Sequence, residues 1–146
     1  EELCRRSEIE TCSMRFFNVY GPGQSAEGGY AAVIPAFKQA IAKGENCRIF
    51  GDGTQIRDFV HINDLVKAIS IALEIETLPS EMNIASGQAT SLLDLLEVFS
   101  SLNSEMKPPL FEPERPGDIH TSLADISQMK KSLSLDEMVS LKEGLV

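Results

Sequence analysis

Short apolar, strand-like runs alternate with helix-like stripes along this chain, and that alternation most constrains its fold. Residues 11–20 form an apolar run that ends at a Gly-Pro-Gly breaker at 21–23, which predicts a buried strand. Residues 33–43 instead carry apolar side chains at helical spacing, and Gly44 is placed to end that helix. Strands that alternate with helices in this way indicate an α/β fold with crossover helices.

The same alternation continues to the end of the chain. Two strand-like runs flank a Gly-Asp-Gly turn at 51–53, and Asn63 or Asp64 can cap the helix that follows. Ser91 and Asp94 form the pattern of a capping box. Strands are expected at 47–50, 56–61, 82–85 and 110–111, and helices at about 63–73, 91–99, 125–133 and after 140.

Composition excludes several classes of partner. The 146 residues carry a formal net charge of -9 with a pI near 4.7, so a nucleic acid would be repelled by the overall field. A small phosphate ligand is still possible, because two local arginines can outweigh the average charge. No apolar run reaches the roughly 18 residues that a membrane span needs. Three cysteines without metal-ligand spacing predict a reduced, cytoplasmic chain with no metal site.

Common catalytic motifs do not occur in the sequence. A Gly-x-Ser-x-Gly elbow, a P-loop and a His-Glu-x-x-His helix are all missing. The Gly-Pro-Gly breaker at 21–23 matches a dinucleotide loop poorly, because the third glycine of that fingerprint would fall at Ala26. His61 is better explained as a structural histidine than as a catalyst.

A set of short motifs follows in a fixed order, and it decides the interpretation. The motifs are RFFNVYGP at 15–22, YAAVIP at 30–35, IFGDGTQIRDFVHINDL at 49–65, NIASG at 83–87, RPGD at 115–118 and ADIS at 124–127. The ordered set resembles the extended short-chain dehydrogenase/reductase family, within it the NAD-dependent nucleotide-sugar epimerases and dehydratases. The segment at 30–35 is most similar to the branch of UDP-hexose and UDP-N-acetylhexosamine 4-epimerases.

This resemblance implies that the chain is the carboxy-terminal part of an extended Rossmann-type fold. Residues 1–20 and about 82–102 would belong with the Rossmann sheet, and the rest mainly with a substrate-binding subdomain. The family's Gly-rich NAD loop and its catalytic Tyr-x-x-x-Lys pair would precede the chain. Neither Tyr20 nor Tyr30 has a lysine four positions on. We therefore expect no catalytic residue here, an inactive isolated chain, and an intact homodimeric enzyme that uses NAD.

The resemblance assigns the diphosphate of a UDP-sugar to Arg57 and Arg115. Arginine suits this task because its planar fork of N–H groups matches phosphate oxygens. The alternative for Arg57 is an ion pair with a nearby aspartate, at 52, 58 or 64, and for Arg115 a solvated loop position. Asp118 would orient an arginine or accept a ribose hydroxyl, and a turn or helix-capping role is the alternative.

Five further residues are assigned by the same resemblance. Asn18, at the end of a strand, would donate to a phosphate or sugar oxygen, unless it serves only the Gly-Pro turn. Val33 would open a helix whose free N–H groups hold phosphate. Phe50 would lie beside the base, or be an ordinary strand residue. Phe16 and Phe17 would lie near the nicotinamide, with core packing as the alternative.

Three functions remain open at this point. The first is an NAD-dependent 4-epimerase, whose intact form oxidises the sugar transiently to a keto-sugar and reduces it again on the other face. The second is a 4,6-dehydratase or decarboxylase of the same family. The third is a short, non-catalytic protein that binds nucleotide sugars.

Overall fold

The computed structural model describes residues 11–26 and 32–146 and confirms the α/β alternation. The strands are β1 (Ser13–Phe16), β2 (Asn18–Tyr20), β3 (Arg48–Phe50), β4 (Ile56–Arg57), β5 (Phe59–His61), β6 (Glu81–Ile84), β7 (Thr90–Ser91) and β8 (Leu110–Glu112). The helices are α2 (Val33–Ala42), α3 (Ile62–Ala72), α4 (Leu92–Leu102), α5 (Ser127–Leu133) and α6 (Leu141–Leu145). None of the helices in these described ranges is long and apolar enough to cross a membrane.

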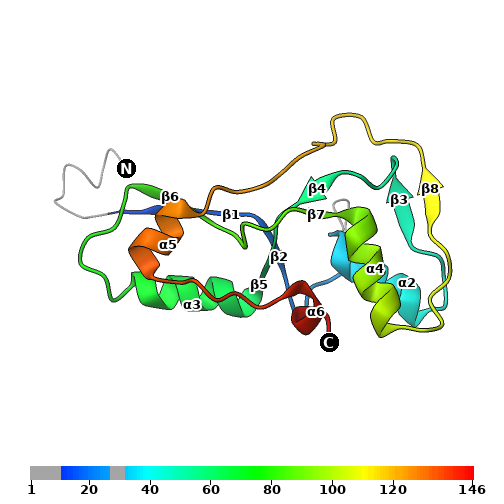
Figure 1. Ribbon diagram of the computed structural model, residues 1–146, viewed down its shortest axis with the longest axis horizontal. Helices are drawn as coiled ribbons and strands as arrows, with labels where there is room; N and C mark the ends of the chain where they lie inside the picture. The colour runs from blue at the N-terminus through cyan, green and yellow to red at the C-terminus, as the bar shows by residue number, and fades with distance from the viewer. Residues whose placement is uncertain (1–10, 27–31) are drawn as a thin grey trace.

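The run expected as one strand at 11–20 is divided at Phe17. Before that residue β1 pairs with β6 in parallel, and after it β2 pairs with β5 in parallel. The Phe17 N–H donates to the Ile84 carbonyl at 3.2 Å, whereas the next N–H, of Asn18, donates to the Asp58 carbonyl at 3.0 Å. The chain therefore changes its pairing partner within two residues, and Figure 1 shows β1 and β2 meeting at an angle there.

The turn at 51–53 is present, but it does not close a hairpin. The Asp52 carboxylate accepts from the Thr54 N–H at 2.9 Å and from its hydroxyl at 2.7 Å, which fixes the turn. On one side of it β3 pairs with β8 in parallel, and on the other side β4 pairs with β7 in antiparallel fashion. The expected strand at 56–61 is likewise split into β4 and β5, at Asp58.

Two of the expected helix starts, those of α4 and α6, are confirmed, and two, those of α3 and α5, differ. Capping boxes form at Ser91, with Asp94, and at the start of α6. Helix α3, however, is capped by His61, whose Nδ1 accepts from the Asn63 N–H at 3.3 Å. Asn63 and Asp64 therefore lie inside the first turn, where the Asp64 carboxylate accepts from the Val139 N–H at 2.9 Å.

The start of α5 also differs from the expectation that Asp125 caps it. The residue that precedes the helix is Ile126, and no side chain caps it. The Asp125 carboxylate instead accepts from the Ser127 N–H at 2.8 Å, one residue earlier than a helix cap would act. The helix itself lies where it was expected and buries Met129 and Leu133.

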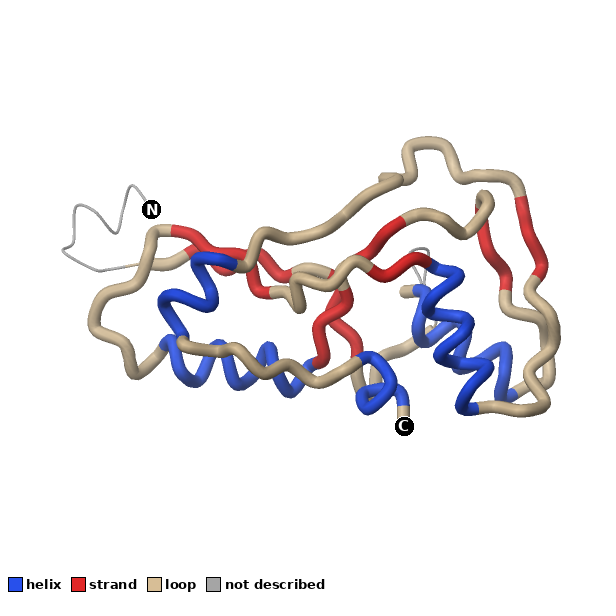
Figure 2. Tube along the Cα trace, in the orientation of Figure 1, coloured by secondary structure: helices blue, strands red, loops and turns tan. Residues whose placement is uncertain are grey.

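The described residues pack around two apolar cores at opposite ends of the molecule (Figures 1 and 2). The α4 core brings together α2, α4, β3 and the ends of β2, β5 and α6. The α3 core brings together α3, α5, β6 and residue 135. Figure 2 shows the long loop between β8 and α5 running along the molecule from one core to the other. That residues 1–20 and about 82–102 belong with the Rossmann sheet stays a prediction, since β1 pairs with β6 but α4 packs in the α4 core. Residues 1–10 of this expected region lie outside the described part of the chain.

Candidate functional site

A cavity of about 370 Å³ lies beside the α4 core. Its wall is made by the end of β2, the start of α2, strands β3 and β4, and the loop that follows β8. All six residues predicted to bind substrate line it: Asn18, Val33, Phe50, Arg57, Arg115 and Asp118. The structure thus brings together residues that are up to 100 positions apart in the chain.

Arg57 is held at the cavity wall by Asp118, not by the aspartates close to it in sequence. Its Nη2 donates to the Asp118 Oδ1 at 2.5 Å, and its Nη1 donates to the carbonyls of Ile56 and Ile119. The two side chains are 16% and 30% exposed, so the pair is largely enclosed while still facing the cavity. Because several bonds hold the guanidinium, its remaining N–H groups are oriented before a ligand arrives.

Asp58, the direct neighbour of Arg57, has a different task. Its carboxylate is fully buried and accepts from the Ser86 N–H at 2.8 Å, the Ser86 hydroxyl at 2.7 Å and the Gly87 N–H at 3.0 Å. A longer bond of 3.3 Å comes from the Ala124 N–H. Its acceptor sites are therefore occupied by structural donors, which leaves Asp118 as the partner of Arg57.

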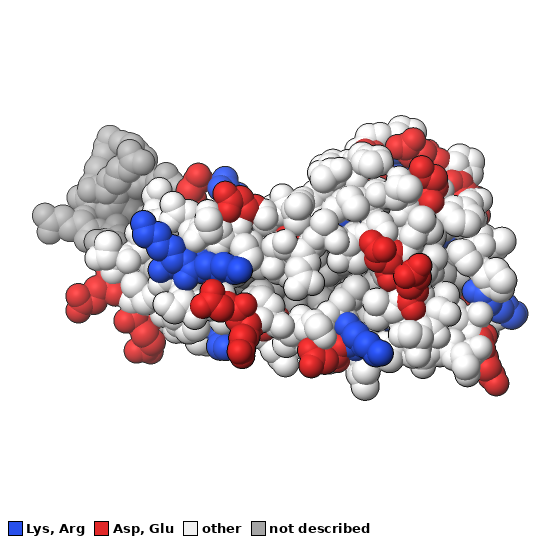
Figure 3. Space-filling view, viewed as in Figure 1, with Lys and Arg blue, Asp and Glu red and all other residues white. Residues whose placement is uncertain are grey.

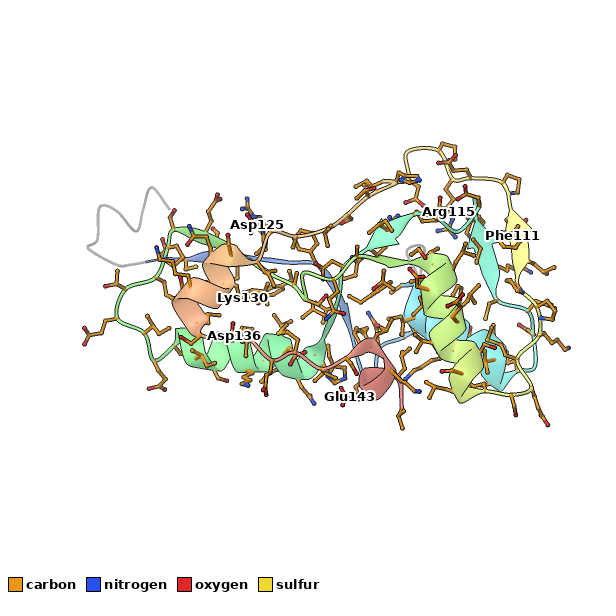
Figure 4. The ribbon with its side chains drawn as sticks, in the orientation of Figure 1. Phe111, Arg115, Asp125, Lys130, Asp136 and Glu143 are labelled. Carbon is orange, nitrogen blue, oxygen red and sulfur yellow. The ribbon has the colours of Figure 1, made fainter. Side chains whose placement is uncertain are left out.

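Arg115 and Phe50 form a stacked pair that also lines the cavity. The guanidinium carbon of Arg115 lies 3.7 Å from the centre of the Phe50 ring, which is a cation–π contact. Figure 4 shows Arg115 beside β3, reached from the loop after β8. Phe50 is thus a cavity residue, and its half-buried ring presents a flat face.

Asn18 and the start of α2 supply neutral donors. The Asn18 amide donates to the Asp58 carbonyl at 2.9 Å, which uses one of its two N–H hydrogens and aligns the side chain at the cavity. This bond goes to the residue between β4 and β5 and not to the Gly-Pro turn. Helix α2 begins at Val33 after Ala32, and within the described ranges no side chain caps its first N–H groups. Uncapped N–H groups at a helix start are suited to hold phosphate.

The two residues predicted to lie near a nicotinamide are outside this cavity wall. Phe16 is 50% exposed at the end of β1, and Phe17 is half-buried where the chain changes partner. Core packing is therefore wrong as a description of Phe16. A cofactor role for the two rings stays a prediction.

Two buried side chains next to the site serve the fold. His61 is 7% exposed and caps α3, as the interpretation of a structural histidine requires. Tyr20 is 3% exposed, and its ring meets the His61 ring edge-on at 5.2 Å. Burial raises the pKa of Tyr20 to about 12, with a smaller contribution from the negative charges of Asp64 and Glu143.

A second, smaller cavity of about 220 Å³ adjoins the first. The two share Phe50, Gln55 and Asp118, and the second is also lined by Asp52 and His120. Two hydrogen bonds from Thr54 hold the pKa of Asp52 below its usual range. The bond from the Thr54 hydroxyl has the larger effect, and the bond from its backbone N–H has the smaller one. Among the residues that the structure describes, no cluster of His, Cys, Asp or Glu could hold a metal ion.

Charge distinguishes the main cavity from the rest of the molecule. Acidic side chains are spread along the surface in Figure 3, and a basic group gathers near α5, which carries Lys130 and Lys131. In the cavity, three arginine side chains meet one carboxylate, so positive charge is in excess by two. The overall charge of -9 is therefore reversed locally, as a diphosphate ligand needs.

Sequence reasoning missed Arg48, Gln24 and Gln55 as cavity residues. Arg48 could have been found, because it lies two positions before Phe50 on one strand, and such residues share a face. Gln55 donates to the Phe50 carbonyl at 2.6 Å, across the turn at 51–53. That contact depends on the path of the turn, which no sequence pattern shows.

Comparison with known proteins now places this geometry in a family. The model of the NAD dependent epimerase/dehydratase family matches residues 1–85, which is more than half of the chain. The chain belongs to this family. It is related to epimerases, dehydratases and decarboxylases that act with NAD on nucleotide sugars, as the ordered motifs predicted.

Similar proteins include enzymes with different reactions. A dTDP-L-rhamnose 4-epimerase of Burkholderia thailandensis is 34% identical over 90% of this chain and 37% of its own length. A UDP-N-acetyl-alpha-D-glucosaminuronate decarboxylase of Bacillus cytotoxicus is 30% identical over 90% of this chain and 43% of its own. The crystal structure of a UDP-glucose 4-epimerase of Thermotoga maritima with UDP-glucose superposes with a TM-score of 0.90 at 34% identity, over 99% of this chain and 46% of that one. The chain thus spans less than half the length of these proteins.

Proposed function

We propose that the cavity binds the nucleotide diphosphate of a UDP-sugar, and that the intact protein is an NAD-dependent UDP-sugar 4-epimerase. The observation that carries the proposal is the convergence of Asn18, Val33, Phe50, Arg57, Arg115 and Asp118 on one wall with an excess of positive charge. We also expect the intact protein to be a cytoplasmic homodimer. On this proposal the carboxy-terminal part of the fold provides the grip on the substrate.

The shape and charge of the cavity suit each part of the ligand. Arg57 and Arg115 offer forked N–H donors to the diphosphate, and the free N–H groups at the start of α2 add neutral donors. The flat ring of Phe50 suits a base, which would take the place on the ring that the Arg115 guanidinium occupies at 3.7 Å and so release Arg115 to the diphosphate. Because these contacts grip the nucleotide and not the sugar, the sugar ring stays free to turn between the two halves of an epimerisation.

Among the described residues, the end of β1 offers a place for a cofactor ring. There Phe16 offers a half-exposed aromatic face two residues before Asn18, so Phe16, with Phe17 beside it, would hold the nicotinamide side. When bound, NAD would accept a hydride from the sugar carbon and return it. The residues of this chain would meanwhile hold the diphosphate in place through Arg57 and Arg115.

A second candidate is a dehydratase or decarboxylase of the same family. It is favoured by the decarboxylase of B. cytotoxicus, which matches 90% of this chain, as the epimerase of B. thailandensis does. Both kinds of enzyme need a nucleotide-sugar binding site of this kind, so the cavity does not distinguish an epimerase from a dehydratase or decarboxylase. Turnover of the intact protein with UDP-glucose, UDP-N-acetylglucosamine and UDP-glucuronic acid decides between the two. Binding without turnover of any of them would favour a non-catalytic protein.

Binding of the nucleotide diphosphate by Arg57 is tested with Arg57→Ala in the intact protein, and UDP affinity is measured by calorimetry. Loss of a forked, charge-assisted donor should weaken UDP about tenfold to a hundredfold. Arg15→Ala is the matched control, because Arg15 lies on β1, pairs with Glu81 at 3.3 Å and is 57% exposed. Equal affinity in wild type and Arg57→Ala would remove Arg57 from the proposed site.

A further inference from the structure

We propose that helix α6 fixes the position of a donor that binds the diphosphate, and that Gly144 is the positioning residue through which α6 acts. This inference rests on the proposed function and adds to it a contact behind the cavity wall. Gly144 does not line the cavity. It acts through Tyr20, which does line the cavity and which ends the strand that begins at Asn18.

The backbone of Gly144 supplies the first argument, because its conformation does not require a glycine. Gly144 lies inside the helical segment Leu141–Leu145, and it is not one of the described glycines with positive φ. Glycine weakens a helix more than any other residue except proline. Where the backbone does not need a glycine, a close approach of another part of the molecule explains it.

Two aromatic rings make that close approach. A Cβ atom at position 144 would lie 2.9 Å from Cε2 of Tyr20 and 2.9 Å from Cδ2 of His61, and closer still to the Tyr20 hydroxyl. Carbon atoms that are not bonded rest at about 3.5–4.0 Å, so a methyl group there would force its neighbours to move. The Tyr20 hydroxyl is buried and has no hydrogen-bond partner in the described part of the chain. Packing against α6, and not a hydrogen bond, therefore places this ring.

Helix α6 is anchored on several sides, so an added methyl group would displace the rings and not the helix. The Val139 N–H, just before α6, donates to the buried Asp64 carboxylate at 2.9 Å. The capping box of Ser140 and Glu143 fixes the first turn, and Leu145 is buried in the α4 core. Figure 1 shows α6 beside the ends of β2 and β5, which carry the two rings.

Strands β2 and β5 connect the rings to a ligand donor. In the register of this parallel pair, Tyr20 lies beside His61, and Asn18 lies beside Phe59. Asn18, Tyr20 and Phe59 all line the cavity. The Asn18 amide is aligned by its 2.9 Å bond to the carbonyl of Asp58, the residue before Phe59. Because close-packed interiors transmit strain, displaced rings at one end of this short pair would move the Asn18 amide at the other end.

The test is Gly144→Ala in the intact protein, with UDP affinity measured by calorimetry. Loss of one aligned hydrogen bond should weaken UDP about fivefold to tenfold. Lys142→Ala is the matched control, because it places the same residue at an exposed position of α6 and should change the affinity by less than about twofold. A thermal melt of each variant confirms that it is folded.

A double variant shows whether Gly144 acts through Tyr20. Tyr20→Phe removes the hydroxyl, which is the atom nearest to the added methyl group. Tyr20→Phe combined with Gly144→Ala should therefore bind UDP to within about threefold of Tyr20→Phe alone. If Gly144 served only the folding of α6, the tyrosine hydroxyl would not matter, and the double variant would bind as weakly as Gly144→Ala. That result would overturn the inference.

The remaining outcomes separate this inference from the proposed function. If Gly144→Ala binds UDP as wild type does, or if neither it nor the double variant folds, the inference is overturned while the proposed function stands. If Gly144→Ala alone does not fold, the comparison of the double variant with Tyr20→Phe decides by the same limit. If wild type does not bind UDP, the proposed function itself fails, and this inference fails with it.

Discussion

The α3 core and the α4 core are built from similar apolar side chains, yet they border on different surroundings. The α3 core is covered by α3 and α5 and contains β6, which pairs with β1 over four residues in register. In the α4 core the strands are two or three residues long, and β3 turns its outer face toward a cavity with an excess of positive charge. Strands β2, β3 and β4 each end at a residue that lines the cavity, whereas the longer pair of β1 and β6 does not line it.

Residues 55–64 form a stretch between the two cores and contribute side chains to both. The buried polar residues of the described chain all fall within it: Gln55, Asp58, His61 and Asp64. Gln55 bonds to β3, His61 caps α3, and Asp64 holds the segment before α6. A change here should affect both regions together, whereas a change inside one core should affect that region first.

The largest effect is expected for Asp58→Asn. The amide replaces one carboxylate oxygen with a donor, which leaves an N–H of Ser86, Gly87 or Ala124 without its acceptor and removes the charge from the other bonds. We expect the free energy of unfolding to fall by about 3–5 kcal/mol, measured by urea denaturation of the intact protein. The control is Asp136→Asn, at an exposed aspartate labelled in Figure 4, and a similar loss there would contradict the role of Asp58.

A smaller, paired effect is expected for Ile49→Ala and Met129→Ala. Both side chains are fully buried, one in each core, so each cavity should cost about 2–4 kcal/mol in the same urea experiment. UDP affinity should differ: Ile49 lies between Arg48 and Phe50, so its loss should weaken UDP several-fold, and Met129→Ala should not. If Met129→Ala weakened UDP as much as Ile49→Ala did, the separation of the two regions would be wrong.

Local signals in the sequence predicted the helices well. Each of these signals acts over three or four residues, as in the capping boxes at Ser91 and Ser140 and at the helix end marked by Gly44. Both partners of each interaction therefore lie within one short sequence pattern. The ordered motifs also predicted six residues that the fold brings to one cavity. The sequence patterns could not predict pairings with residues that are far away in the chain.

Three examples show why such pairings cannot be predicted from local sequence. The strand at 11–20 is divided because β6 and β5, which pair with its two parts, come from distant segments. Arg57 pairs with Asp118, which is 61 residues away, and not with the three nearer aspartates. Each of those accepts from another donor: Asp52 from Thr54, Asp58 from Ser86 and Gly87, and Asp64 from Val139. Arg48 was missed because an exposed strand arginine is ordinary until the fold shows which wall it faces.

The smallest effect is expected at Tyr20, which belongs to the α4 core but touches the stretch between the cores. Its hydroxyl is buried and has no hydrogen-bond partner among the described residues. Tyr20→Phe should therefore leave the free energy of unfolding at neutral pH unchanged or raise it by about 1 kcal/mol. UDP affinity at neutral pH should also stay within about twofold, because the hydroxyl faces Gly144 and not the ligand.

Alkaline pH should separate the variant from wild type. Because burial raises the pKa of Tyr20 to about 12 in the folded protein, the unfolded chain releases this proton first, near its ordinary pKa of about 10. The contribution of Tyr20 to stability is thus complete below pH 10 and is lost as the pH rises toward 12, by about 3 kcal/mol in all. Urea denaturation between pH 9 and about 11.5 should show a shallower decline for Tyr20→Phe than for wild type. Parallel declines would mean that the Tyr20 proton is released equally easily in the folded and unfolded states, and that this side of the α4 core is open to water.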